Sequence, residues 1–235
     1  MKNRYVNAVI AGIATVQIAS AGNIVGTVTL DGTPPSEKDI TPLKEDMTCG
    51  KLVAGMPKTR FFVVGANKGL ADVVVLLRGV SSKSTGASAA PVVLDQKGCL
   101  YVPSILALQT GQKLIVKNSD PVLHNVHTKP TVSGNMEKNL SQLPNAPDLT
   151  FTFDKPEAFL KFQCDVHSWM FAWITVVDHP YFAVTDQDGK FTIKNVPAGK
   201  YTVAALHRKA APTGVEKEVE VKEADVTADF TLEVK

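Results

Sequence analysis

Short apolar runs separated by turn-forming residues are the main pattern of this chain beyond residue 22. The runs are rich in β-branched side chains, and helical periodicity is hard to find. Many short strands at regular spacing predict an all-β protein built from one or two β-sandwiches. The predicted strands cover residues 23–30, 71–77, 112–117, 149–153, 159–164, 172–177, 182–185, 190–193, 201–206, 215–221 and 227–234.

Other segments interrupt the strand pattern. Residues 35–47 and 135–143 are weak helix candidates that we interpret as loops, and residues 81–90, rich in Ser, Ala, Thr and Gly, are typical of a loop or linker. The sequence D-Q-D-G at 186–189 separates two predicted strands and therefore predicts a hairpin at 182–193.

Residues 1–21 have the pattern of a secretory signal peptide. Lys2 and Arg4 form a basic start, an uncharged run rich in Val, Ile and Ala follows over 6–19, and A-S-A at 19–21 is a cleavage site of the A-x-A type. We therefore expect a periplasmic or secreted protein with no membrane span after cleavage. An uncleaved membrane anchor is the alternative.

Composition, charge and missing motifs mainly narrow the range of protein classes to which this chain can belong. The chain has 235 residues, of which 44% are hydrophobic and 20% charged, which favours one or two packed domains over disorder. Its 25 Lys and Arg residues are balanced by 23 Asp and Glu residues, so no nucleic-acid partner is expected. P-loop, HExxH and GxSxG motifs are absent from the sequence, and no convergent acid and base are visible, so an enzyme is not expected.

Candidate chemistry is concentrated near residue 164. Cys164, His167 and Met170 form a Cys-x2-His-x2-Met motif after a predicted strand, and His124 lies upstream in a separate loop. One Cys, two His and a Met are the ligands of a type 1 (blue) copper site, in which a trigonal His2Cys set is completed by a weak axial Met. A tight loop between two strands can direct three side chains at one ion. The soft thiolate and thioether favour copper, especially Cu(I).

The same part of the chain resembles the cupredoxin family of amicyanin- and plastocyanin-like proteins. Its resemblance covers about residues 91–177, and the length of the ligand loop is like that of amicyanins. Two motifs carry it in the right order. One is F-T-F-D-K-P-E-A-F at 151–159 with F-Q-C at 162–164, and the other is Y-V-P at 101–103, T-G-Q at 110–112, N-S-D at 118–120 and H-N-V at 124–126.

This resemblance implies a cupredoxin Greek-key β-sandwich over residues 91–178 that binds one copper ion. Its ligands would be His124, Cys164, His167 and Met170, and Asn125 would join the two ligand loops by hydrogen bonds. The implied function is single-electron transfer between redox partners. A copper-delivery protein and a metal-free β-sandwich interaction module are the alternatives.

A second resemblance concerns the C-terminal part of the chain. Residues 184–203 are similar to the carboxypeptidase-regulatory-like (transthyretin-like) β-sandwich, which implies such a domain over 179–235. G-T-V-T-L-D-G-T-P at 26–34 is similar to the opening of these modules. The N-terminal β segment 22–90 is therefore a candidate part of that sandwich, with two tandem domains as the alternative. Proteins with this fused arrangement are often labelled methylamine-utilisation-like, but no residue identifies methylamine.

Three cysteines in an exported protein permit one disulfide and leave one thiol. Cys164 lies near a histidine in the sequence, whereas Cys49 and Cys99 do not, so we pair Cys49 with Cys99. The other pairings stay open. A bridge closing a loop of this length would stabilise the fold by about 4 kcal/mol on the chain-entropy model.

The remaining histidines and tryptophans are expected to have other roles. His127 lies three residues after His124, so on a strand it faces the other way. We interpret it as a surface or supporting residue, with a second metal site as the alternative. His179 and His207 are expected to be structural or exposed. Trp169 and Trp173 are candidates for an apolar docking rim or for the core.

Overall fold

The computed structural model describes residues 21–234, which form 17 strands, two short α-helices and two 3-10 helices. The strands form four sheets, so the all-β expectation is confirmed. The signal-peptide prediction lies outside the described residues except for Ala21. Within residues 21–234, no helix is both long and apolar enough to cross a membrane.

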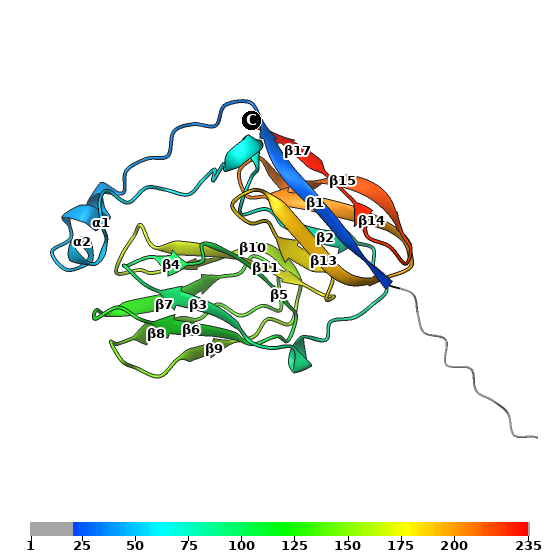
Figure 1. Cartoon of the computed structure of the whole chain (residues 1–235). Helices are drawn as coiled ribbons and strands as arrows, with labels where there is room; N and C mark the ends of the chain where they lie inside the picture. Colours follow the sequence, from blue (N-terminus) through cyan, green and yellow to red (C-terminus); the bar gives the residue numbers. More distant parts are fainter. Residues whose placement is uncertain (1–20, 235) are drawn as a thin grey trace, which may run out of the picture.

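Strands β3 to β11 form one sandwich, called here the first sandwich (Figure 1). Alternate residues of its strands fill the core, among them Phe151, Leu160, Phe162 and Cys164. One sheet has the order β5 (Ile105–Gln109), β11 (Phe171–Val177), β10 (Glu157–Gln163), β7 (His124–Lys129) and β8 (Asn139–Gln142). The other has the order β4 (Tyr101–Val102), β3 (Val92–Gln96), β6 (Leu114–Asn118) and β9 (Leu149–Phe151).

The second sandwich joins the two ends of the chain. Strand β1 is antiparallel to β13 and parallel to β16 and β17, and β2 lies between β12 and β14, so the first sandwich is inserted between β2 and β12. One sheet contains β1 (Ala21–Asp31), β13 (Lys190–Pro197), β16 (Val226–Thr227) and β17 (Phe230–Glu233). The other contains β12 (Phe182–Val184), β2 (Val74–Arg78), β14 (Gly199–His207) and β15 (Ala211–Val221).

The predicted hairpin at 182–193 is wrong. The turn forms, because the Asp186 N–H donates to the Lys190 carbonyl at 3.0 Å, but β12 pairs with β2 and β13 pairs with β1. Thr185 stabilises the point where the chain passes from the sheet of β12 to the sheet of β13. Its hydroxyl donates to the Leu70 carbonyl (2.8 Å) and accepts the Val73 N–H (3.0 Å). The turn is therefore a corner between two sheets.

Several elements differ from the sequence expectations. Helix α1 (Thr41–Glu45) occurs in a segment that we interpreted as a loop, and helix α2 (Cys49–Leu52) was not predicted. The 3-10 helices are η1 (Ala66–Lys68) and η2 (Gly86–Ser88). Strands β3, β4, β5, β7 and β8 were not predicted. Strand β8 lies in a segment that we interpreted as a loop; it is an edge strand with three of its four residues exposed, so it has no apolar alternation to detect.

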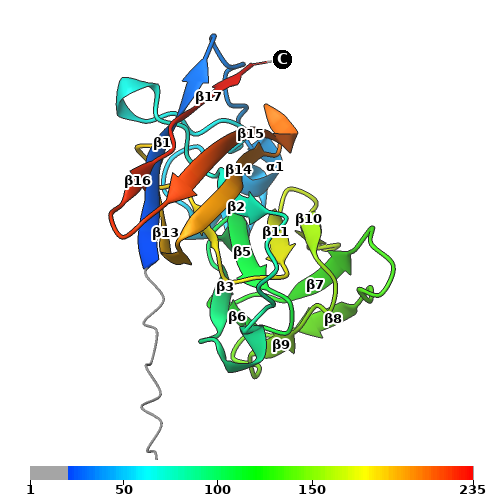
Figure 2. The same cartoon turned by 90° about the vertical axis from the view of Figure 1, so that its right-hand side faces the viewer.

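Two contacts join the sandwiches. Residues 32–73, called here the arm, leave β1, carry α1 and α2 past the end of the first sandwich beside β4, and return to β2 (Figure 1). The second contact is an apolar cluster where β2 and β14 lie over β5 and β11 (Figure 2). Its buried members are Val74, Leu76, Ile105, Ala107, Val177, Ala204 and Leu206.

Candidate metal centre

The four predicted ligands come from two neighbouring parts of the first sandwich. His124 begins β7, Cys164 follows β10, and His167 and Met170 lie in the loop between β10 and β11. This loop is tight, because the Cys164 N–H donates to the Met170 carbonyl (3.0 Å) and the Met170 N–H to the His167 carbonyl (2.9 Å). All four side chains are buried, and His167 is the most exposed at 8%.

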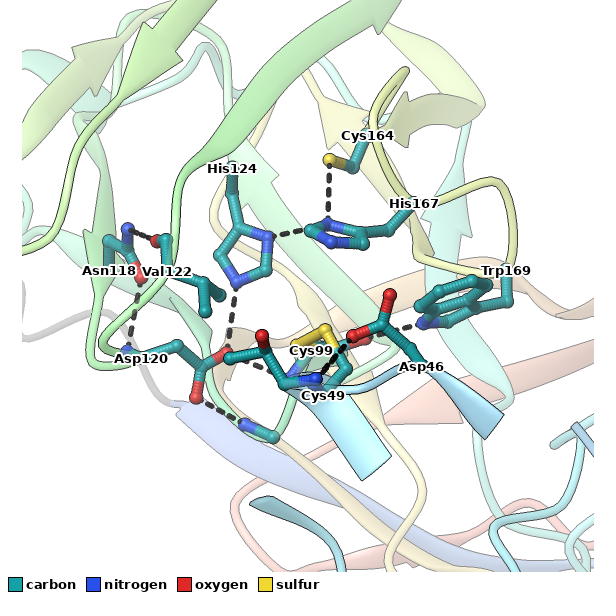
Figure 3. The surroundings of a disulfide bond; sticks show 12 residues. Asp46, Cys49, Cys99, Asn118, Asp120, Val122, His124, Cys164, His167 and Trp169 are labelled. Atoms are coloured by element: carbon teal, nitrogen blue, oxygen red, sulfur yellow. Dashed lines mark hydrogen bonds and ion pairs between the residues drawn. A yellow bond between two sulfur atoms is a disulfide. The ribbon is translucent and has the colours of Figure 1, made fainter. Parts of the chain in front are cut away.

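Three of the four donor groups converge (Figure 3). The Nδ1 atoms of His124 and His167 are 3.0 Å apart, and the Cys164 Sγ is 3.6 Å from the His167 Nδ1. One nitrogen of each imidazole and the sulfur thus lie within 4.8 Å of one another. Met170 is fully buried and belongs to the same core cluster as Cys164.

Asn125 lies between the two ligand-bearing segments. Its backbone N–H donates to the Cys164 Sγ at 3.5 Å, and its side-chain oxygen accepts the Asp165 N–H at 2.6 Å. The Tyr101 hydroxyl donates to the Asn125 carbonyl at 3.0 Å. These bonds hold the start of β7 against the end of β10, so the spacing of His124 and Cys164 is set by the protein.

Asp120 is a further part of the centre that was not predicted from the sequence. Its Oδ2 lies 3.0 Å from the His124 Nε2, and its two oxygens accept the N–H groups of Gly98 (2.6 Å) and Cys99 (2.7 Å). A carboxylate on one ring nitrogen orients the imidazole and fixes which nitrogen is free for a metal. Here the other nitrogen is Nδ1, which lies 3.0 Å from the His167 Nδ1 in the group that also contains Cys164. The N-S-D triplet before His124 was the available sequence signal.

The site favours a thiolate. Burial alone would raise the pKa of Cys164, but the hydrogen bonds from His124 and from the Asn125 N–H outweigh it and lower the pKa. For His124, burial opposes the charged form, while Asp120 and Cys164 together raise its pKa. Burial and the neighbouring His124 lower the pKa of His167. A thiol of lowered pKa beside two imidazoles suits a metal that binds sulfur and nitrogen.

The predicted disulfide between Cys49 and Cys99 is confirmed, and it packs against the candidate metal centre. Both sulfur atoms and a ring nitrogen of His167 lie within 4.8 Å of one another. Asp46 accepts the Cys49 N–H (2.7 Å), and the Trp169 Nε1 donates to the Cys99 carbonyl (3.1 Å). The arm therefore covers His167, a feature that the sequence spacing gave no means to detect.

The other histidines lie outside the centre. His127 points away from His124 and is engaged on both ring nitrogens, by Asp165 and by Glu137, each at 2.6 Å. His179 and His207 are buried in the second sandwich, where the His179 Nε2 lies 2.9 Å from the Leu77 carbonyl.

The two tryptophans differ in position. The Trp169 ring lies 5.2 Å from that of His167 and packs against the disulfide cluster. Trp173 is at the boundary between the sandwiches, where the Arg208 guanidinium lies 4.7 Å from its ring. Trp173 is thus part of the contact between the sandwiches, whereas Trp169 lies beside the metal centre.

The donor set fits copper. Cys164, His124 and His167 offer one thiol and two imidazoles close together in a buried space, and Met170 is buried in the same core cluster as Cys164. Together these groups have the composition of a type 1 site. The Asp120 carboxylate is on the far ring nitrogen of His124. These residues could therefore hold one ion among Cys164, His124 and His167.

Comparison with known proteins shows similarity over parts of the chain only. Residues 180–235 match the family model of the second β-sandwich domain of BOS complex subunit NOMO1-like proteins. No curated protein matches the chain. A copper-containing nitrite reductase from Thermus scotoductus SA-01 is similar over 43% of this chain and 25% of its own, with 21% identity and a TM-score of 0.35. A Cu(I) amicyanin variant is similar over 43% of this chain and 97% of its own, with 19% identity and a TM-score of 0.31.

Proposed function

We propose that the protein binds one copper ion through His124, Cys164 and His167, with Met170 as a weaker fourth ligand, and transfers single electrons between redox proteins. The observation that carries the proposal is the convergence of two Nδ1 atoms and one thiol in a buried site. When bound there, copper supplies a one-electron change of valence. We further propose that the protein is exported and acts in the periplasm or outside the cell, which the signal-peptide pattern of residues 1–21 supports.

Rigid placement of the ligands favours electron transfer. Asn125 and Asp120 fix the two sides of the site by hydrogen bonds, and the loop that carries His167 is closed on itself. A site whose donors are already in place needs little rearrangement when the charge of the ion changes. Four protein donors also leave no position for a substrate, so we propose a carrier and no enzyme.

Burial of the site argues against copper delivery. A delivery protein must exchange its ion readily, whereas the arm and the disulfide cover His167 in this structure. A metal-free interaction module remains the second candidate for the second sandwich. The match of residues 180–235 to a β-sandwich family model supports that role for this part of the chain.

The test is a visible absorption spectrum of the protein with one equivalent of Cu(II), recorded before and after ascorbate. We expect an intense thiolate-to-copper band that bleaches on reduction and returns on reoxidation. The variant C164S should lose the band and keep its β-sheet circular dichroism, because the core and the disulfide do not depend on the metal. The variant H127N, which changes a histidine on the same strand as His124 but outside the site, should keep it. A band that persists in C164S, or no copper binding by the unchanged protein, would refute the proposal.

A further inference from the structure

A second group of metal-binding side chains lies beside the proposed copper site. Cys49 Sγ, Cys99 Sγ and a ring nitrogen of His167 are within 4.8 Å of one another, and all three side chains are buried. Figure 3 shows His167 between Cys164 on one side and the disulfide on the other. In the disulfide form, neither Cys49 nor Cys99 offers a thiolate, so this group binds no ion strongly.

We propose that reduction of the Cys49–Cys99 disulfide creates a second, soft-metal site for Cu(I), formed by the two thiolates and His167. A dithiol reductant would transfer two electrons and two protons: the S–S bond breaks, two thiols form, and the reductant becomes a disulfide. Cu(I) then displaces the thiol protons into solvent as it binds. Two thiolates and an imidazole are ligands that Cu(I) favours.

Each cysteine is held in place by bonds other than the disulfide. The Cys49 N–H donates to Asp46 (2.7 Å), and the Cys99 N–H donates to Asp120 (2.7 Å). The Trp169 Nε1 also donates to the Cys99 carbonyl at 3.1 Å, and Leu43 is fully buried in the same cluster as both cysteines. The two thiols therefore stay opposite each other and beside His167 after reduction.

This second site goes beyond the proposed electron transfer and would link it to the redox state of the Cys49–Cys99 disulfide. His167 belongs to both groups of donors, since it faces Cys164 and also the disulfide. Cu(I) bound by Cys49 and Cys99 would compete for this imidazole with an ion at Cys164 and His124. With the disulfide intact, His167 would be available only to the first site. With the disulfide reduced, Cys49 and Cys99 would offer an alternative position for the same metal.

The test uses the full chain with the C164S substitution, which removes the thiolate of the first site. The protein is reduced with a phosphine under argon, its free thiols are counted, and Cu(I) is titrated in competition with bathocuproine disulfonate. We expect the reduced protein to bind one Cu(I) more than about 100-fold more tightly than the oxidised protein. Changing a residue that only supports a ligand typically alters metal affinity by about 10- to 100-fold.

The substitution C49S in the same C164S protein should remove this tight binding. Both proteins are compared in the reduced state, so neither gains stability from a disulfide, and T48S, beside Cys49, is the matched control that should keep it. Equal Cu(I) affinity before and after reduction, tight binding that survives C49S, a disulfide that resists reduction, or loss of β-sheet circular dichroism on reduction would each overturn the inference. The visible band of the unchanged oxidised protein tests electron transfer separately, so the two proposals can fail independently.

Discussion

Asp120 connects the candidate metal centre to the segment that carries Cys99. One carboxylate contacts the His124 imidazole and accepts the N–H groups of Gly98 and Cys99, and these bonds outweigh burial to lower the pKa of Asp120. The Asp120 carboxylate therefore has two separable effects on the metal centre. It places the imidazole, and its negative charge favours the more oxidised state of an ion bound at the Nδ1 side.

We predict that D120N raises the reduction potential of the copper-loaded protein and lowers its stability. The amide keeps an acceptor oxygen but loses the charge and one acceptor position, so unfolding of the metal-free protein should become easier by about 1–3 kcal/mol. A spectroscopic redox titration and urea denaturation measure the two effects. D154N, at an exposed position of the same sandwich, is the control. An unchanged potential would show that the Asp120 charge does not act on the site.

His207 makes the second sandwich sensitive to acid. Burial, with a smaller contribution from the positive charge of Arg208, lowers its pKa to about 4 from the usual 6.5 of histidine, and its Nδ1 accepts the Ala210 N–H at 3.1 Å. Between pH 6.5 and 4, the unfolded chain therefore binds a proton that the folded chain does not. Stability falls as the pH falls through this window, by up to about 3 kcal/mol.

We predict that H207Q flattens the dependence of unfolding free energy on pH between 6.5 and 4. Glutamine keeps an acceptor for the turn between β14 and β15 but cannot titrate. Urea denaturation at several pH values, with the unchanged protein as reference, measures the difference. Parallel curves for the two proteins would show that His207 does not contribute to the loss of stability in acid.

At the scale of elements, sequence patterns located strands that carry an apolar run and missed those that do not. Strands β1, β2, β11 and β14 bury most of one or both faces, and the apolar residues that do so are visible in the sequence. Strand β7 has the sequence H-N-V-H-T-K and is buried because polar groups find partners inside the site. Such burial depends on tertiary contacts that periodicity cannot report.

In the candidate site, too, some residues could be predicted from the sequence and others could not. His124, Cys164 and His167 converge, and spacing together with the cupredoxin resemblance had pointed to them. The role of Asp120 and the cover of His167 by the arm were missed, because they join residues that are distant in the sequence or lack a motif. The disulfide itself was predicted by elimination, but its position against the metal centre was not.

The part of the arm that carries α1 and α2 packs beside the disulfide, where Leu43 of α1 is fully buried together with Cys49. We predict that L43A leaves a cavity beside the disulfide and destabilises the arm by about 2–4 kcal/mol. Amide hydrogen exchange over residues 41–52 should become faster, and a chelator should remove copper from the loaded protein sooner.

The control for this prediction is M47A, between helices α1 and α2. Met47 is 85% exposed, so its truncation removes little packing and should change neither rate. If L43A and M47A release copper equally fast, the arm does not limit access to the metal centre.

At the scale of the whole molecule, the apolar cluster between the sandwiches is a contact that can couple their unfolding. Ile105 on β5 packs in this cluster with Val74 and Leu206 of the second sandwich. A charge at this position would be buried without a partner, at a cost of several kcal/mol. We expect the metal-free protein to unfold in one calorimetric transition, and we predict that I105D gives two.

V93D, at a position on β3 that is 42% exposed, is the control and should keep one transition. One transition in I105D as well would mean that the arm and the chain connections couple the sandwiches without the cluster.

Strand β1, at the start of the described chain, pairs with β17, near its end. It runs parallel to β17, where the hydroxyls of Thr29 and Thr231 lie 3.2 Å apart although they are 202 positions apart in sequence. A nascent chain emerging from a ribosome or a translocation pore cannot complete this sheet until residues 230–233 have appeared. Strands β3 to β11, in contrast, are contiguous and have all their partners early. The sandwich that holds the metal centre can therefore fold before β1 has paired with β17.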